Sequence, residues 1–388
     1  MNVGIIAEYN PFHSGHKLHI TNTRALTGAD NIIAIMSGSF VQRGEPAILD
    51  KFSRTRMALT NGVDMVLELP VRYAAGSADV FAMGAVESLD KSGIVDMLSF
   101  GTEAGDIELF KEAAELLADE SEEFSQAVKE EMGKGISYAA ARQAALTRVL
   151  SRDMSFLSLP NNILALEYLK ALKKLNSSIV PVTVRREVSD YNSTQLTGRI
   201  SSAAAIRHSI FSGEWDTALA AVPSDCRSML KEVVFGKKPH IDSYSEVLKY
   251  ILRTKSANEL SQIDDISEGL ENRILVASDL PTVSEIADAV KSKRYAHSRV
   301  RRALLHIILG ITKADAAKNV DYIRVLGFRR EKAHLVSELT QKAAVPVITN
   351  IKNAPADLIR QELFATDIYY MPLSGETNKD YTTPMVIV

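Results

Sequence analysis

Short apolar runs alternate with stretches of helical periodicity over about the first 215 residues. The apolar runs are rich in Val, Ile, Leu and Met and lack the polar-apolar alternation of a half-exposed strand, which indicates strands buried on both faces. They cover residues 3–7, 31–36, 64–69, 95–100 and 179–184. Helical spacing covers residues 51–61, 78–91 and 161–175, and Gly62 and Gly93 stand where two of these helices should stop. This order predicts an α/β fold, a parallel sheet with helices on both faces.

The second half of the chain has a different pattern. Beyond about residue 215 the strand signal fades and helical patterns dominate, for example over residues 244–252, 283–291 and 298–309. We therefore expect an α/β domain over residues 1–215 and a second, mainly helical domain over residues 216–388. A helical insert is expected at about residues 106–151. Ten Asp or Glu residues against two Lys residues at positions 106–131 favour a solvated helix face there, with repulsion of the wrong part of a polyanion as the weaker alternative.

Positive charge is concentrated late in the sequence. Residues 291–332 contain twelve Lys or Arg residues against three Asp or Glu residues, whereas the whole chain carries a formal charge of −3. Such a local excess is typical of a face that binds a polyanion, because each neutralised phosphate releases counterions. Solvated helix faces are the alternative interpretation.

Composition excludes several classes of protein. The 388 residues are 46% hydrophobic and 24% charged, which is typical of a globular protein and argues against disorder or fibres. The longest largely apolar run, residues 303–311, is far shorter than a membrane span and is interrupted by His306. The first residues lack a basic leader, so we expect a cytoplasmic protein. A single cysteine, Cys226, excludes an internal disulfide and a multi-cysteine zinc site.

The most specific local signal is N-P-F-H-S-G-H at residues 10–16, directly after the first predicted strand and at the start of a helix that runs to about residue 26. Gly15 permits close backbone approach, and a helix N-terminus offers unpaired N–H groups and a positive dipole end. His13 and His16, three residues apart, can face the same anion. These parts suit a phosphate site, although a helix cap with two surface histidines would share the letters.

The H-x-G-H letters at residues 13–16 resemble the signature of the nucleotidyltransferase superfamily, which binds ATP and transfers AMP to an acid or a phosphate. The sequence I-S-S-A-A-A-I-R at residues 200–207 is similar to a later element of that superfamily that contacts ATP phosphates. It departs from the pattern by alanines in place of a threonine and by one extra residue. The resemblance implies a Rossmann-like nucleotidyltransferase fold, with phosphate contact by Ser201 and Ser202.

Further motifs narrow the resemblance. They are E-Y-N-P-F-H at 8–13, S-G-S-F-V-Q-R-G-E-P-A at 37–47, E-L-P at 68–70, F-G-T-E at 100–103, L-P-N-N-I-L at 159–164, R-R-A-L-L-H at 301–306 and Y-I-R-V-L-G-F at 322–328. Together they resemble the tRNA(Met) cytidine acetate ligase family over nearly the whole chain. The resemblance implies an enzyme that activates acetate with ATP to acetyl-adenylate, releases pyrophosphate and acetylates N4 of the wobble cytidine of elongator tRNA(Met).

The same resemblance implies a set of ligand contacts. His13 and His16 are the expected catalytic residues. The expected ATP contacts are Ile6, Ala7, Glu8, Tyr9, Asn10, Pro11, Phe12, His13, Ser14, Gly15, His16, Lys17, Leu18, His19, Gly101, Asn161 and Arg186. We prefer Arg186 to Arg185 for a phosphate, because Arg185 lies on the opposite strand face and should be solvated. The family's Tyr-His pair is Tyr191-Asn192 here, so this chain has no imidazole at that position.

A glycine-containing loop follows the second predicted strand. Residues 37–50 include Gln42 and Arg43, and Lys51 and Arg54 come just after them. Ligands of open α/β sheets bind at the carboxyl edge of the strands, so we expect this loop to close over acetyl-adenylate or to meet the cytidine, with Gly38 and Gly44 as hinges. A purely structural loop is the alternative.

RNA recognition fits the basic segment. The expected tRNA contacts are Arg294, Arg299, Arg301, Arg329 and Arg330. His297 and His306 are expected to be surface or packing residues. Mg²⁺ is expected with ATP, held mainly by phosphates and waters, and no protein metal cluster is expected. Two other functions stay open: an adenylyltransferase or acid-amine ligase for a small metabolite, and a non-catalytic RNA-binding module.

Overall fold

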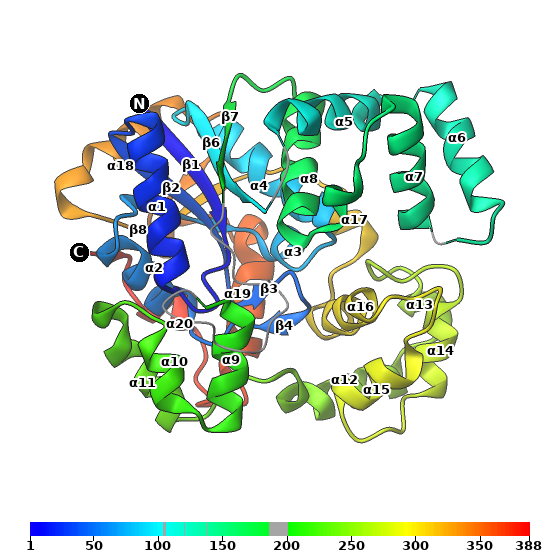
Figure 1. Ribbon diagram of the computed structural model, residues 1–388. Coiled ribbons are helices and arrows are strands. Elements are labelled where there is room, and N and C mark those ends of the chain that lie inside the picture. The colour runs from blue at the N-terminus through cyan, green and yellow to red at the C-terminus, as the bar shows by residue number, and fades with distance from the viewer. Residues whose placement is uncertain (104–105, 120, 137, 186–200) are drawn as a thin grey trace.

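A central sheet organises the protein, as the computed structural model in Figure 1 shows. The structure describes residues 1–103, 106–119, 121–136, 138–185 and 201–388. Among them, eight strands form one sheet in the order β10-β8-β5-β2-β1-β6-β7, with β9 beside β8. The strands are β1 (Asn2–Ala7), β2 (Asn31–Ser37), β5 (Met65–Leu69), β6 (Met97–Thr102), β7 (Val180–Arg185), β8 (Ile323–Phe328), β9 (Val347–Ile348) and β10 (Val386–Ile387).

All five strands expected from the apolar runs are present. β7, β6, β1, β2 and β5 are neighbours in that order, and every pair of neighbours is parallel. Their carboxyl ends therefore meet at one edge of the sheet, where open α/β folds bind ligands. The α/β prediction with a mainly parallel sheet is confirmed.

Helices cover both faces of this sheet, and alternate residues of β2 show how the faces divide. Ile33 and Ile35 pack in the core formed with α4 (Ala78–Ser92), α5 (Ile107–Asp119) and α8 (Pro160–Lys174). Ile32, Ala34 and Met36 pack in the opposite core, with α1, α2 and α9 to α11. The bounds of the second group are α1 (Ser14–Thr27), α2 (Lys51–Thr60), α9 (Ala203–Ser212), α10 (Trp215–Ala220) and α11 (Arg227–Phe235).

The acidic insert is helical as expected. It forms α5, α6 (Glu122–Met132) and α7 (Tyr138–Leu150), drawn at the upper right of Figure 1. Phe110, Phe124 and Ala141 are buried in the core of that side, while most acidic residues of α5 and α6 are at least partly exposed. The insert's charge is therefore mostly on solvated helix faces.

A third core lies in the helical part of the second half. α12 (Ser245–Thr254), α15 (Val283–Val290), α16 (His297–Leu309) and α19 (Ala356–Tyr370) surround it. Phe40, Val71 and Ala75 from the first half insert into the same core, so the helices pack directly on the loops that leave β2 and β5. The remaining α-helices of the described chain are α3 (Val71–Ala74), α13 (Ala257–Leu260), α14 (Leu270–Val276), α17 (Lys313–Ala316), α18 (His334–Lys342) and α20 (Lys379–Thr382).

The chain returns to the sheet after this helical part, which the fading strand signal did not predict. β8 pairs antiparallel with β5, and β9 and β10 pair with β8. The apolar run of β8 contains Arg324 and Gly327, which obscured it within a basic segment. The division into two domains at residue 215 stays a prediction.

Four buried charges explain how an arginine fits into that strand. Arg324 donates to Glu68 at 2.8 Å and contacts Asp380 at 2.7 Å, and Lys51 lies 2.8 Å from both carboxylates. Burial alone raises the pKa of Asp380, but Lys51 and Arg324 outweigh it and lower the pKa to about 2. We call Lys51, Glu68, Arg324 and Asp380 the buried charge cluster; it fastens α20 and β8 to the carboxyl end of β5.

Candidate functional site

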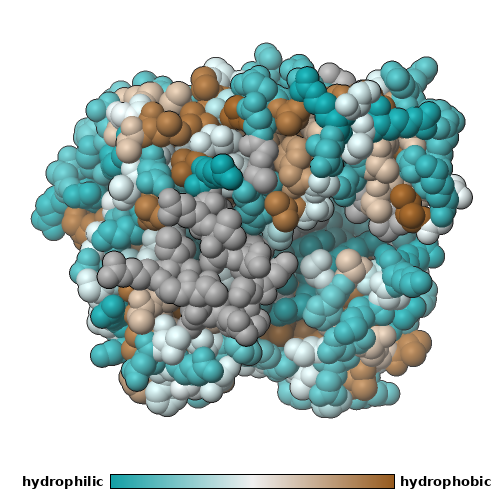
Figure 2. All heavy atoms as spheres, viewed as in Figure 1, coloured by the Kyte–Doolittle hydropathy of each residue, from teal (hydrophilic) through white to brown (hydrophobic). Residues whose placement is uncertain are grey.

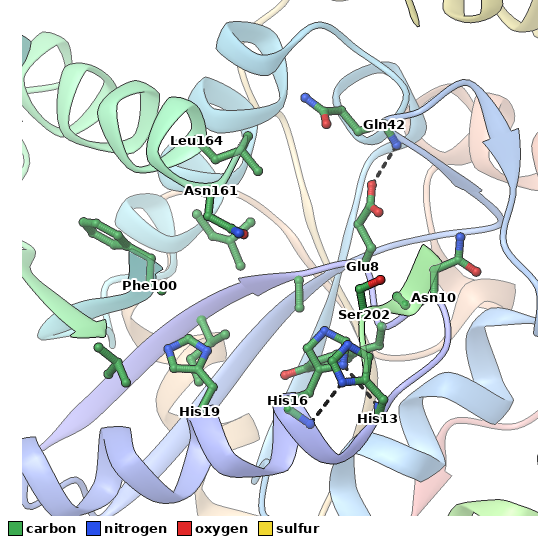
Figure 3. A pocket seen from close by; sticks show the side chains of 18 of the residues that line it. Glu8, Asn10, His13, His16, His19, Gln42, Phe100, Asn161, Leu164 and Ser202 are labelled. Atoms are coloured by element: carbon green, nitrogen blue, oxygen red, sulfur yellow. Dashed lines mark hydrogen bonds between the residues drawn. The ribbon is translucent and has the colours of Figure 1, made fainter. Parts of the chain in front are cut away.

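A pocket of about 190 Å³ lies at the carboxyl ends of β1 and β6, between the N-termini of α1 and α9. Polar and apolar groups line different parts of it, as Figure 3 shows. Figure 2 shows a hollow on this face of the molecule, between the helices α5 to α8 and the helices α12 to α16. Position and lining agree with the expected site at the sheet's carboxyl edge.

The two histidines of the H-x-G-H motif cap α1 and line the pocket. The Gly15 N–H donates to His13 Nδ1 at 3.0 Å, and the His13 N–H donates to His16 Nδ1 at 3.2 Å. Because an Nδ1 that accepts a hydrogen bond carries no proton, each neutral ring holds its proton on Nε2. The rings stack with centroids 3.7 Å apart. The cap therefore fixes both rings with Nε2–H as the donor, at a helix end that already favours anions.

A strained turn brings the motif from strand to helix. Tyr9, between β1 and α1, has φ of +48°, an uncommon conformation for a non-glycine residue. Asn10 is held on both sides, since its Oδ1 accepts from the Ile48 N–H at 2.7 Å and its carbonyl accepts from Arg207 at 2.7 Å. This region is thus fixed by contacts from distant segments.

The structure gathers most of the expected ATP contacts in the pocket. From residues 6–19 it places Ile6, Ala7, Glu8, Tyr9, Asn10, His13, Gly15, His16, Leu18 and His19 in the lining, together with Gly101, Asn161 and Ser202. It leaves Pro11, Phe12, Ser14, Lys17 and Ser201 out of the lining. Phe12 is a core residue, and the Ser14 hydroxyl donates to the Ala221 carbonyl at 3.0 Å.

The two arginines compared for a phosphate contact are Arg185 and Arg186. Arg185, the last residue of β7, is exposed, as expected, and it also lines the pocket. Arg186 and the pair Tyr191-Asn192 lie outside the described residues. Which of the two arginines contacts a phosphate stays a prediction.

The start of α9 forms a second wall. Ser202 caps this helix, its Oγ accepting from the Ala205 N–H at 3.1 Å, and it lines the pocket with Ala203 and Ala204. Ser201 is buried beside it and does not line the pocket. Of the two serines of the motif, Ser202 is the one that lines the pocket, and its contact with a phosphate stays a prediction.

A hairpin made by β3 (Phe40–Val41) and β4 (Glu45–Pro46) brings Gln42 and Arg43 to the pocket. The Gln42 N–H donates to Glu8 Oε1 at 2.8 Å. Glu45 is held by Arg207 at 2.9 Å and by Arg301 at 3.1 Å, so the hairpin is clamped between α9 and α16. Arg207 is one of the lining residues that sequence reasoning did not assign to the site, although it stands at the end of the I-S-S-A-A-A-I-R motif.

The glycines of this loop, and Arg54 just beyond it, have structural roles. A side chain at Gly44 would meet the backbone of Arg301 at 2.7 Å, and one at Gly38 would meet Glu68 at 2.6 Å. Both glycines are needed for close packing rather than as hinges. Arg54 is fully buried and donates to the carbonyls of Glu8, Ser37, Gly38 and Leu49.

An apolar wall faces the histidines across the pocket. Phe100 and Leu164 line it, and Asn161 at the start of α8 donates its amide to Glu103. His19 contacts Ser99 at 3.2 Å. The arrangement offers a flat apolar surface at one end and anion-binding donors at the other, as a nucleotide requires.

The structure separates the basic segment into two places. Arg294, Arg299 and Arg301 belong to α16 and the loop before it, and Arg301 contacts the pocket's hairpin through Glu45. Arg329 lies within 4.0 Å of Asp64, which precedes β5, so it and the exposed Arg330 are at the opposite, amino edge of the sheet. The five expected tRNA contacts therefore do not form one surface.

A cluster of Asp264, Asp265 and His306 lies elsewhere and lines no part of this pocket. Arg302 binds both oxygens of Asp265, at 2.7 and 3.2 Å. His306 is fully buried and bridges the Asp264 and Ala75 carbonyls, at 3.2 and 2.9 Å. The packing role expected for His306 is confirmed, and the cluster joins α16 to the first half of the chain.

Known proteins resemble this chain throughout its length. Residues 1–383 match the family model described as HIGH Nucleotidyl Transferase. The tRNA(Met) cytidine acetate ligase of Thermoanaerobacter sp. (strain X514) is 42% identical over 400 residues, which cover 99% of each chain. The protein of the same name from Acetivibrio thermocellus is 37% identical and covers 100% of this chain and 99% of its own.

The chain belongs to the tRNA(Met) cytidine acetate ligase family. Solved structures of this acetate ligase family agree with the fold: TmcAL of Thermotoga maritima without ligand gives a TM-score of 0.93 at 33% identity, covering 100% of this chain and 99% of that one. The same protein bound with alpha-thio ATP gives 0.91. The family resemblance and the fold class expected from the sequence are confirmed. No helix within the described ranges is both long and apolar enough to span a bilayer.

Proposed function

We propose that this protein is an ATP-dependent ligase that activates acetate to acetyl-adenylate and acetylates N4 of the wobble cytidine, position 34, of elongator tRNA(Met), giving N4-acetylcytidine, AMP and pyrophosphate. The observation that carries the proposal is the pair His13 and His16, held as Nε2–H donors at the N-terminus of α1 beside a pocket at the sheet's carboxyl edge. Family membership supplies the substrates.

The histidines act on the phosphates. An acetate oxygen attacks the α-phosphorus, the bond to the bridging oxygen breaks, and the electron pair leaves with pyrophosphate. Negative charge then grows on that leaving group, and donors placed in advance stabilise it most. His13, His16 and the N–H groups of α1 would supply those donors, with Ser202 and the start of α9 opposite them.

ATP contact by the expected set, with the exception of the Glu8 side chain, stays part of the proposal. We propose that the base lies against Phe100, Leu164 and Val184, and that the phosphates extend toward α1. Mg²⁺ would neutralise phosphate charge. Among the described lining residues Glu8 is the one carboxylate, so phosphates and waters would be the ion's main ligands.

The tRNA would approach from the side of α16. Arg294 is exposed there, and Arg301 links this helix to the pocket's hairpin. Arg299 donates to the Asp265 carbonyl and to Ser267, and so also orders the helix start. For Arg329 and Arg330 to bind the tRNA, it would need a second contact with the protein at the amino edge of the sheet. A tRNA substrate would also favour a cytoplasmic location.

The test is incubation with ATP, Mg²⁺, isotopically labelled acetate and elongator tRNA(Met), followed by mass spectrometry of the digested nucleosides. We expect labelled N4-acetylcytidine, and its loss in His13→Ala and His16→Ala. Acetate-dependent pyrophosphate release without label on the tRNA would favour ligation to a small metabolite. Binding of tRNA with no pyrophosphate release would favour an RNA-binding module.

A further inference from the structure

A carboxylate in the middle of an anion site needs an explanation. Glu8 directly follows β1 and lies between the histidine pair and the β3–β4 hairpin, as Figure 3 shows. Among the described residues that line the pocket it is the one Asp or Glu. A carboxylate repels the phosphates that the histidines attract, so its natural ligand is a hydrogen-bond donor or a proton.

The contacts of Glu8 leave half of its carboxylate available. Oε1 accepts the hydrogen bond from the Gln42 N–H at 2.8 Å, which fixes the orientation of the group. Oε2 has no hydrogen bond or ion pair to any described residue, although Arg54 holds the Glu8 carbonyl at 2.7 Å. The side chain is half-buried and lines the pocket. One oxygen is thus anchored and the other can receive a ligand.

The surroundings make this carboxylate a better base than an exposed one. Burial raises the pKa of Glu8 above its usual range, and the raised value persists although the Gln42 N–H, Arg207 and Arg43 each lower it. Glu45 on the same hairpin raises it further, while being itself bound to Arg207 and Arg301. These charged groups face Glu8 from β4, α9 and the hairpin turn. Arg54 of α2 also interacts with Glu8, and the titratable His13 and His16 line the pocket from the start of α1.

We propose that Glu8 receives the acceptor cytosine, accepting a hydrogen bond from its N4 amino group and taking a proton from N4 when the acetyl group is transferred. The inference rests on the proposed function and names a residue for its second step. Cytosine presents an N4 amino donor, which a carboxylate recognises, whereas uracil presents an O4 acceptor that a carboxylate repels. Glu8 would therefore also discriminate between the two pyrimidines.

Glu8 is the only protein group needed to account for the bonds and the proton in the proposed transfer step. The N4 lone pair attacks the carbonyl carbon of acetyl-adenylate and forms the N–C bond. The C–O bond to the phosphate breaks, and its electron pair leaves with AMP. N4 becomes acidic as it bonds to carbon, and its proton passes to Glu8 and then to water. The exocyclic amine of cytosine is a weak nucleophile because its lone pair is delocalised into the ring, so a positioned base helps it.

The decisive experiment measures the two half-reactions separately. Acetate-dependent exchange of pyrophosphate with ATP reports activation. Single-turnover transfer of labelled acetate to elongator tRNA(Met), between about pH 5 and about pH 9, reports the step assigned to Glu8. Glu8→Gln keeps an oxygen that can accept from the Gln42 N–H but removes the base. We expect its transfer rate to fall roughly 100-fold or more, and at least about 10-fold further than its exchange rate.

The pH profile gives a readout that a structural role would not move. A carboxylate base must be ionised, so wild-type transfer should decline as the pH falls through the raised pKa of Glu8. Glu8→Gln should lose this decline, and Glu8→Asp should keep it at a lower rate. Glu45→Gln is the matched control, since it removes a carboxylate of the same hairpin that does not line the pocket. Its two half-reactions should fall together and its pH profile should keep the decline.

Three outcomes would overturn the assignment. Equal losses of the exchange rate and the transfer rate in Glu8→Gln would indicate that Glu8 acts on the nucleotide in the activation step. If the pH profile of Glu8→Gln were the same as that of the wild type, another group would accept the N4 proton. If the variant transferred acetate at the wild-type rate, Glu8 would have no role in the transfer step. Failure of the proposed function is distinguishable, because wild-type protein would then show no acetate-dependent exchange.

Discussion

Two polar clusters lie at the same edge of the sheet and illustrate two uses of charge. The buried charge cluster joins β5, α2, β8 and α20, and each of its two cations meets both of its carboxylates within 2.8 Å. The pocket beside β1 and β6 instead directs its polar groups toward a cavity. Charges that neutralise each other stabilise a join between segments, whereas groups left facing a cavity are available to a ligand.

The difference between the buried charge cluster and the pocket shows how a sequence motif should be interpreted. Glu68 and Arg324 occur in family-like motifs just as Glu8 and His16 do. The first pair is buried and mutually bonded, with side chains 1% and 6% exposed. The interaction partners of a motif residue at the sheet edge therefore indicate its role. A residue bonded to other protein charges is structural, and a residue that faces a cavity is a candidate for ligand binding.

The largest expected effect comes from breaking the buried charge cluster. Arg324→Met should lower the free energy of unfolding by about 3 to 5 kcal/mol, because it leaves two buried carboxylates with one cation. Urea unfolding followed by circular dichroism measures it. Arg253→Met is the control: its pair with Asp279 is largely exposed, and a loss below about 1 kcal/mol is expected. Similar small losses in both variants would contradict the distinction between the clusters.

The second effect concerns catalysis rather than folding. His16→Ala should lower acetate-dependent pyrophosphate exchange roughly 100- to 1,000-fold, as is usual when a preorganised donor is removed from a transition state. Its free energy of unfolding should fall by only about 1 kcal/mol, for the lost cap contact to the His13 N–H. His297→Ala, on an exposed histidine outside the pocket, should leave both quantities unchanged. If the loss of exchange activity in His16→Ala were accompanied by a large loss in the free energy of unfolding, His16 would be a structural residue.

The third effect is a pH dependence of stability. Since the pKa of Asp380 is lowered to about 2, its ionised form stabilises the folded state above the ordinary Asp value near 3.8, and this contribution is lost as the pH falls toward 2. The contribution amounts to about 2 kcal/mol. Asp380→Asn should be less stable at neutral pH and should have a flatter stability profile in acid. Acid unfolding at several urea concentrations measures it, and parallel profiles would argue against the shift.

The smallest effect tests which basic site meets RNA. Arg294→Glu, beside α16, should weaken tRNA binding about fivefold to tenfold and lower its salt dependence. Arg330→Glu is matched to it, since both residues are exposed but Arg330 lies at the amino edge of the sheet. Filter binding at several salt concentrations compares them. Equal losses in both variants would require a tRNA surface that extends across both edges.

Sequence reasoning found the features that depend on neighbouring residues. The five parallel strands follow from local apolar runs, and the His13–His16 cap follows from a strand, a glycine and a helix start in one short segment. β8 was missed because Arg324 is tolerated in it only through Glu68 and Asp380, from distant segments. The clamp of Arg207 and Arg301 on Glu45 was missed for the same reason, because it joins three segments that no periodicity connects.

The position of β8 has a consequence for synthesis of the chain. Arg324 and Glu68 are 256 residues apart, so the outer edge of β5, an entirely buried strand, stays uncovered until β8 has left the ribosome. At typical elongation rates of about 5 to 20 residues per second, this delay is roughly 10 to 50 seconds. An apolar strand edge exposed for that long is a target for chaperones and a risk for aggregation. The nascent chain thus holds its early strands in an incomplete sheet while its helical half is still being translated.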